Sequence, residues 1–176
     1  MKGKIMSKKM NQNGEKMPNA HLHELMVDEL KDIYNAERQL LAGLKKLVST
    51  AEGEELKNAF KEHLQETEGQ IDKLKQVFQL LDLPARGKKC KAMEGLLNEA
   101  DEIMSEFEGS EALDAALVAA AQKVEHYEIA TYGSLATYAK LMQHDDVAAI
   151  FAEILEQEKN ADEKLTQVAM SKANKK

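Results

Sequence analysis

KVEHYEIATY, residues 123–132, occupies the middle of a helical pattern that runs from about residue 110 to residue 142. Along one side of this pattern, a seam of residues recurs at alternating steps of four and three, the spacing of a helix that faces a bundle core. This seam consists of Leu117, Ala121, Val124, Glu128, Thr131, Leu135, Tyr138 and Met142. Glu125 lies one turn before Glu128, so two carboxylates project from one side of the helix. Because a buried charge without a partner is costly, this seam is either exposed or meets positive charge there.

Two further segments carry a seam of the same kind, apolar at both ends with one acid in the middle. In residues 20–48 the seam is Met26, Leu30, Ile33, Glu37, Leu40, Leu44 and Leu47. In residues 146–170 it is Val147, Phe151, Ile154, Glu158, Ala161, Leu165 and Val168. Residues 54–81 form a fourth helical pattern, interrupted at mid-length by the polar residues His63, Glu66, Thr67 and Gln70. The sequence therefore predicts four long helices, each with polar groups near half its length.

The connections predict how these helices are arranged. Short breaks near residues 49–53 and 143–145 join two helical pairs, whereas residues 82–109 form a long connection with a shorter helix over 92–104. Good helix formers dominate the composition, and only two prolines occur. We therefore predict an all-α fold, a ferritin-like antiparallel four-helix bundle with one long crossover that carries an extra short helix.

The bundle domain is expected to span residues 19–170, with Asn19 and Ser110 as helix N-caps. Residues 1–18 carry five lysines and one glutamate without apolar periodicity, so we expect a flexible basic leader. Residues 171–176 carry three lysines and are expected to be a basic tail.

Charge and composition exclude several functions. The formal net charge is −7 and the two ends together carry +7, so the body between them carries about −14. An acidic body argues against nucleic acid as a partner. Cys90 is the only cysteine, which excludes an intrachain disulfide and a cysteine-based zinc site. No apolar run approaches the roughly twenty residues of a membrane span, so we expect a cytoplasmic protein without membrane contact.

The central acids predict a metal site. Each long helix spans roughly 35 to 45 Å, and the midpoints of antiparallel helices meet at one level. Five carboxylates would converge there, from Glu37, Glu66, Glu125, Glu128 and Glu158. Without cations they would repel one another and raise their own pKa values. Two divalent metal ions would remove the conflict, and oxygen ligands suit iron(II), manganese(II) or magnesium.

Other interpretations of these residues stay open. An acid on one seam is often exposed or paired with lysine, although four seams with matching acids favour metal. His63 could be a metal ligand, a hydrogen-bond donor to Glu66 or a polar core residue, and we favour the last two. Tyr34 and Tyr132 lie one turn from seam acids, where they could hydrogen-bond carboxylates or act as ordinary core aromatics.

The chain resembles the YciF-like family of bacterial ferritin-like proteins. The resemblance covers residues 21–169 and rests on the segments LHELMVDELKDIYNAERQLL, AFKEHLQETEGQIDKL, KKCKAMEGLL, VEHYEIATYGSL and LEQEKNADEKL. It implies a ferritin-like bundle related to rubrerythrins, a di-metal site, a homodimer and an association with stress responses.

Similarity to rubrerythrin-type sites also implies a ligand set. Glu37 and Glu66 match the ligands of the first two helices, Glu125 and Glu128 the Glu-x-x-Glu of the third, and Glu158 the ligand of the fourth. The usual histidines three residues after the second-helix and fourth-helix acids are missing, because Gly69 and Ala161 stand there. Oxygen ligands lie four residues on instead, from Gln70 and Asp162. The implied site is rich in oxygen and less selective for iron(II).

Three functions follow as hypotheses. The first is a di-metal carboxylate protein, with iron ahead of manganese or magnesium, that acts as an oxidase, peroxidase or ferroxidase on oxygen or peroxide. The second is a metal-stabilised structural or interaction bundle of the stress response that has no turnover. The third, a cage-forming storage or DNA-protecting protein, fits the acidic body and long crossover least.

Overall fold

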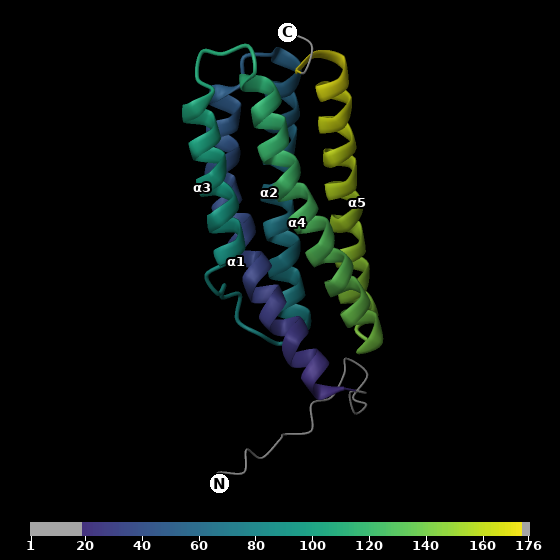
Figure 1. Cartoon of the computed structure of the whole chain (residues 1–176). Helices are drawn as coiled ribbons and strands as arrows, with labels where there is room; N and C mark the ends of the chain where they lie inside the picture. The colour runs from purple at the N-terminus through teal and green to yellow at the C-terminus, as the bar shows by residue number, and fades with distance from the viewer. Residues whose placement is uncertain (1–18, 174–176) are drawn as a thin grey trace.

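The structure is a computed structural model that describes residues 19–173. This part of the chain contains five α-helices and no strand, and the helices are labelled in Figure 1. They are α1 (Ala20–Thr50), α2 (Glu54–Leu80), α3 (Lys91–Glu106), α4 (Leu113–Leu141) and α5 (Asp145–Val168), followed by a π-helical turn, η1 (Ala169–Ala173). The all-α prediction is confirmed.

The long helices form a four-helix bundle in which α3 is the additional element. Helices α1 and α2 form one hairpin and α4 and α5 the other, and α2 packs against α5 while α1 packs against α4. Figure 1 shows neighbouring long helices running in opposite directions, with α3 lying along α1 and α4. The chain between α2 and α4 is the predicted long crossover, and α3 is its predicted short helix.

Local contacts explain why α3 lies against α1. Gly43 of α1 has no side chain, and a Cβ atom there would lie only 2.5 Å from Leu97 Cδ2 of α3. Glycine therefore leaves the room into which Leu97 packs. An exposed ion pair between Lys46 Nζ and Asp101 Oδ2, 2.7 Å apart, links the same two helices.

The predicted helix ends agree with the structure at one cap and differ at another. Asn19 caps α1, since its Oδ1 accepts hydrogen bonds from the backbone N–H groups of His21 and Leu22. Ser110 does not cap α4, because the helix starts at Leu113 and Ala112 occupies the N-cap position. The residues before α4 form a turn instead, in which the Leu113 N–H donates to the Ser110 carbonyl. The prediction of Ser110 as N-cap was wrong.

The two predicted tails are described only in part. Helical structure continues through η1 to Ala173, so it extends three residues into the range predicted as a basic tail. The predicted leader, residues 1–18, and the last residues, 174–176, lie outside the described part of the chain. No described helix is long and apolar enough to cross a membrane.

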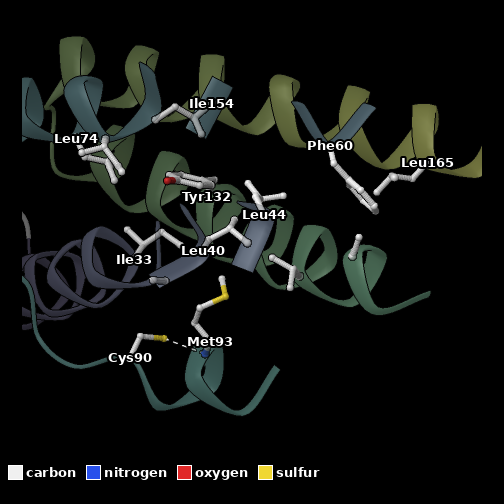
Figure 2. Packing of buried hydrophobic residues seen from close by; sticks show 14 of the residues in the cluster. Ile33, Leu40, Leu44, Phe60, Leu74, Cys90, Met93, Tyr132, Ile154 and Leu165 are labelled. Atoms are coloured by element: carbon white, nitrogen blue, oxygen red, sulfur yellow. Dashed lines mark hydrogen bonds between the residues drawn. The ribbon is translucent and has the colours of Figure 1, made fainter. Parts of the chain in front are cut away.

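The core is apolar at both ends of the bundle, as the seams predict. Figure 2 shows buried side chains from all five helices meeting between the ribbons. Full burial of each large apolar side chain contributes about 1.5–3 kcal/mol. Tyr34 packs edge-on against Phe78, with ring centroids 5.3 Å apart, and is one of the core aromatics.

A buried aspartate joins the α1–α2 loop to α4. The two carboxylate oxygens of Asp114 accept hydrogen bonds from the backbone N–H groups of Glu52 and Gly53, both at 2.9 Å. Asp114 is only 5% exposed. Replacing it with alanine would remove the hydrogen-bond acceptor of both N–H groups.

We expect Asp114→Ala to lower the free energy of unfolding by about 2 kcal/mol, because it leaves two loop N–H groups unpaired. Urea unfolding checks this value. Asp101→Ala, which removes an exposed ion-paired acid, is the matched control and should change stability by less than about 1 kcal/mol. Equal effects of the two variants would contradict the assigned role of Asp114.

Candidate metal centre

Four buried side chains from three helices converge at the middle of the bundle. They are His63 of α2, Glu125 and Glu128 of α4, and Glu158 of α5. Each offers one nitrogen or oxygen atom, and these four atoms lie within 4.8 Å of one another. The exposed fractions are 5% for His63, 1% for Glu125, and 0% for Glu128 and Glu158. This arrangement could hold a metal ion.

Helical spacing places each acid at this level. Glu125 and Glu128 are three residues apart on α4, so their carboxylates project from one side of that helix. Glu158 occupies the middle of the α5 seam, between the buried residues Ile154 and Ala161. The predicted convergence of these three carboxylates is what the structure shows.

Glu37 of α1 adjoins this cluster and is fully buried. Its Oε1 accepts a short hydrogen bond from the hydroxyl of Tyr132, which lies on α4. No residue in the described part of the chain forms a hydrogen bond with its Oε2. Of the two interpretations that the sequence left for Tyr132, the structure shows the one in which its hydroxyl bonds a carboxylate. This hydrogen bond fixes one oxygen of Glu37 and leaves the other available.

The chemistry of the donors fits a cation. Several carboxylate oxygens at the centre have no hydrogen-bond partner among the described residues, namely Oε2 of Glu37, Oε2 of Glu125 and both oxygens of Glu128 and Glu158. Buried polar atoms are nearly always hydrogen-bonded, and each one left unpaired costs about 1–3 kcal/mol or more. A divalent metal ion would satisfy these atoms, and carboxylates with one imidazole are suitable ligands for iron(II) or manganese(II).

Burial and mutual repulsion raise the pKa values of the central carboxyl groups. Desolvation raises the pKa of Glu37 from 4.5 to about 7, even though the Tyr132 hydroxyl and His63 favour its charged form. Desolvation also raises the pKa of Glu128 well above its usual value, and the charges of Glu37 and Glu158 raise it further. Desolvation and the charge of Glu37 raise the pKa of Glu158 in the same way. Without a metal ion, the centre therefore favours bound protons.

His63 lies between a buried and an exposed carboxylate. Its Nε2 is 3.1 Å from Oε1 of Glu125, and its Nδ1 is 3.7 Å from Oε2 of Glu66. Burial alone would lower the pKa of His63, but the negative charge of Glu125 and the contact with Glu66 raise it well above 6.5. The imidazole of His63 therefore lies between the exposed carboxylate of Glu66 and the buried carboxylate of Glu125.

Besides Glu37, three further predicted ligands lie outside the four-residue cluster. Glu66 has a side chain that is 43% exposed on α2, and its Oε2 lies 3.7 Å from Nδ1 of His63. Asp162 is half-buried on α5, where Oδ1 accepts a hydrogen bond from Gln122 Nε2 at 3.0 Å and Oδ2 lies 3.4 Å from Nε2 of the exposed His126. Neither carboxylate is part of the four-residue cluster, although Glu66 contacts one of its members, His63.

Gln70 is the third predicted ligand outside the cluster, and its surroundings differ from those of the other two. The side chain is buried, and its Nε2 lies 3.4 Å from Oε1 of Gln157 on α5. Within residues 19–173, no group forms a hydrogen bond with the Gln70 Oε1. Gln70 is therefore a buried polar residue whose amide oxygen is available to a ligand.

The sequence interpretation did not favour His63 as a ligand, yet a signal for it was present. A strict four-three seam along α2 passes through Leu56, Phe60, His63, Thr67, Gln70 and Leu74, and all six are buried. Glu66 lies one position off this seam and is exposed. The spacing that located the acids on the other helices therefore locates His63, and not Glu66, on α2.

Comparison with known proteins places this chain in a family. A family model described as "Domain of unknown function (DUF892)" matches residues 21–176. The chain belongs to the DUF892 family. Protein YciF of Escherichia coli (strain K12) is 46% identical over 156 residues, which covers 88% of this chain and 94% of YciF. The resemblance to YciF-like proteins is confirmed.

Solved structures show the same fold. The crystal structure of the E. coli stress protein YciF superposes with a TM-score of 0.84 at 45% identity, covering 90% of this chain and all of that one. YcfI from Rhodopseudomonas palustris gives a TM-score of 0.82 at 42% identity, over 84% of this chain and 94% of YcfI. A protein from Xanthomonas campestris pv. campestris gives 0.68 at 25% identity, over 85% and 92% of the two chains. The helical bundle is therefore shared with E. coli YciF and with these two further bacterial proteins.

Proposed function

We propose that this DUF892 protein binds two divalent metal ions per chain, iron foremost, and uses them in oxidase, peroxidase or ferroxidase chemistry. The observation that carries the proposal is the buried cluster of His63, Glu125, Glu128 and Glu158, whose donor atoms lie within 4.8 Å of one another. Buried carboxylates without partners destabilise a fold unless a cation meets them. The cluster is therefore best explained as a binding site.

The arrangement of the residues suits two ions. His63, Glu125, Glu128 and Glu158 would supply donors for one ion, since their donor atoms lie within 4.8 Å of one another. Glu37 interacts electrostatically with Glu128 and keeps one oxygen without a hydrogen bond, so these two carboxylates would hold a second ion. Gln70 offers a further buried oxygen that has no hydrogen-bond partner among the described residues. Glu66 and Asp162 remain ligand candidates only if their side chains turn inward on metal binding.

The protein's own groups prepare the centre for chemistry. The hydroxyl of Tyr132 donates a hydrogen bond to Oε1 of Glu37 and so holds the carboxylate in place. The second oxygen, Oε2, is thereby given a fixed orientation. Apolar seam residues above and below the layer exclude water, so charges inside interact strongly. Carboxyl groups with raised pKa values can release protons when cations bind and take them up again when cations leave. Bound iron would supply the electrons for reducing oxygen or peroxide.

Iron oxidation tests the catalytic part. We expect anaerobically loaded iron(II) protein to be oxidised on mixing with oxygen or peroxide at least about tenfold faster than iron(II) in buffer, since the donors bring metal and oxidant together. Stopped-flow absorbance at a fixed iron concentration measures this rate. A fully loaded protein that oxidises iron no faster than buffer would exclude turnover.

The second candidate is a metal-stabilised structural bundle without turnover. It is favoured by the complete burial of Glu37, Glu128 and Glu158, because metal binding there would relieve the repulsion inside the fold. In that case metal would raise the melting temperature, and iron would be oxidised at the rate found in buffer.

The wider setting belongs to the same proposal. E. coli YciF is described as a stress protein. We infer a stress-related role for this chain from its 46% identity to YciF. We also propose a cytoplasmic homodimer that does not bind nucleic acid. The acidic body supports the last point, since phosphate backbones repel it.

A further inference from the structure

A pocket between α2 and α5 leads from the surface to the proposed metal centre. It has a volume of about 130 Å³, and its lining includes Phe60, Glu62, His63, Glu66, Asn160 and Lys164. Helices α2 and α5 lie side by side in the bundle, and Figure 2 shows Phe60 and Leu165 close together between them. We call this the α2/α5 pocket.

The floor of the α2/α5 pocket is the imidazole of His63, which is 5% exposed. Each ring nitrogen faces a carboxylate, and neither forms a hydrogen bond of ideal geometry with any described residue. One nitrogen is directed to exposed Glu66 at 3.7 Å and the other to buried Glu125 at 3.1 Å. His63 is thus a donor group that can be reached from the pocket and also belongs to the buried cluster.

The mouth of the pocket carries two negative side chains and one positive side chain. Glu62 and Glu66 are both on α2, and the single lysine of the lining, Lys164 of α5, forms a close ion pair with Glu62. Glu66 is left as the carboxylate beside the imidazole, with 43% of its side chain exposed. A hydrated divalent cation would meet this carboxylate first, then the His63 nitrogen, and then the Glu125 oxygen.

We propose that the α2/α5 pocket is the loading site of the centre, where Glu66 captures a divalent cation from water and passes it to His63. Glu66 therefore acts as a transfer ligand, and this role rests on the metal-binding function proposed above. The ion pair between Glu62 and Lys164 offsets part of the negative charge at the mouth of the pocket. The pocket offers room for a cation with its water, whereas the buried cluster is packed within 4.8 Å.

Loading kinetics test this role without relying on activity. Metal-free full-length protein would be mixed with Co²⁺ in a stopped-flow instrument, and a chromophoric indicator would report free Co²⁺. We expect Glu66→Gln to slow uptake about tenfold, because one charge of a cleft that attracts the cation is lost. The final number of Co²⁺ ions per chain should equal that of wild type.

Two further variants sharpen the experiment. Glu68→Gln removes the same charge from an exposed position of α2 that does not line the pocket, and it should load at the wild-type rate. Lys164→Gln frees Glu62 and should speed uptake about two- to threefold. Salt should slow wild-type uptake more than uptake by Glu66→Gln, since exposed charges are screened.

Each outcome separates the loading role from metal binding itself. If wild type takes up no Co²⁺, the metal-binding function fails. If wild type loads and Glu66→Gln loads equally fast, only the loading role is overturned. A Glu66→Gln protein that loses an ion at saturation would also overturn it, because Glu66 would then be a resident ligand. Thermal unfolding of each metal-free variant checks that exposed substitutions leave the fold intact.

Discussion

Wild-type protein purified without chelators is expected to contain about two iron or manganese ions per chain, whereas the Glu37→Ala/Glu128→Ala variant should contain almost none. Both carboxylates are fully buried, and Glu37 Oε2 and both oxygens of Glu128 have no hydrogen-bond partner among the described residues. Removing them deletes donors that no neighbouring side chain replaces. Mass spectrometry of the metal content measures the difference.

The same pair of proteins should differ strongly in how metal affects stability. A ligand present at a thousandfold excess over its dissociation constant stabilises the folded state by about 4 kcal/mol. We expect this gain in wild type and no measurable gain in the double variant. The Glu68→Ala/Glu163→Ala protein is the matched control, because it loses two exposed glutamates and should keep its metal and its stabilisation. Equal metal content in all three proteins would exclude the buried site.

Without metal, the protein should lose stability as pH rises from about 5 to 8. The pKa of Glu37 is about 7 in the folded protein against 4.5 as its ordinary value, so the folded state binds more protons than the unfolded state between these values. The contribution of Glu37 to the stability of the folded state is therefore greatest below about pH 4.5 and is lost as pH rises through about 7.

Other central groups act in the same direction. The pKa values of Glu128, Glu158 and His63 are also raised in the folded state, so each loses its contribution as pH rises through its folded value. Urea unfolding in the presence of a chelator, at pH 5, 6, 7 and 8, measures the slope. The Glu37→Gln variant should show a shallower slope over this range, since it lacks the titrating group.

Saturating metal should reverse this dependence. Cations bind deprotonated carboxylates, so binding releases protons and strengthens with pH. Wild type with excess metal is therefore expected to gain stability between pH 5 and 7, where the metal-free protein loses it. A metal-free protein whose stability is independent of pH would show that the central carboxyl groups titrate normally.

The sequence was sufficient for the fold because the pattern repeats on separate helices. Each four-three seam is a property of one helix, and the loop lengths decide which helices form antiparallel pairs. The acids Glu37, Glu128 and Glu158 were located in the same way, since each interrupts an otherwise apolar seam. Burial of all three in the structure follows from their seam positions.

The site on α2 was harder to predict because this helix has several polar residues at mid-length. Neighbouring positions on a helix differ by about 100° of rotation, so one step moves a side chain from core to surface. That step separates Glu66, which is exposed, from Thr67, which is fully buried. His63 falls on the buried seam. The resemblance to Glu-x-x-His sites instead implies Glu66 and Gln70 as the ligands of this helix.

The sequence by itself determined the helical class, the pairing of the long helices and the depth at which the seam acids meet. The tertiary structure alone decided which side chains from different helices share that depth. It brought His63 to Glu125, gave Glu37 the hydroxyl of Tyr132, and left Glu66 and Asp162 outside. The physical reason is that spacing along one helix fixes a direction about its own axis, whereas a site needs the rotation of each helix relative to its neighbours, which packing of all the side chains sets.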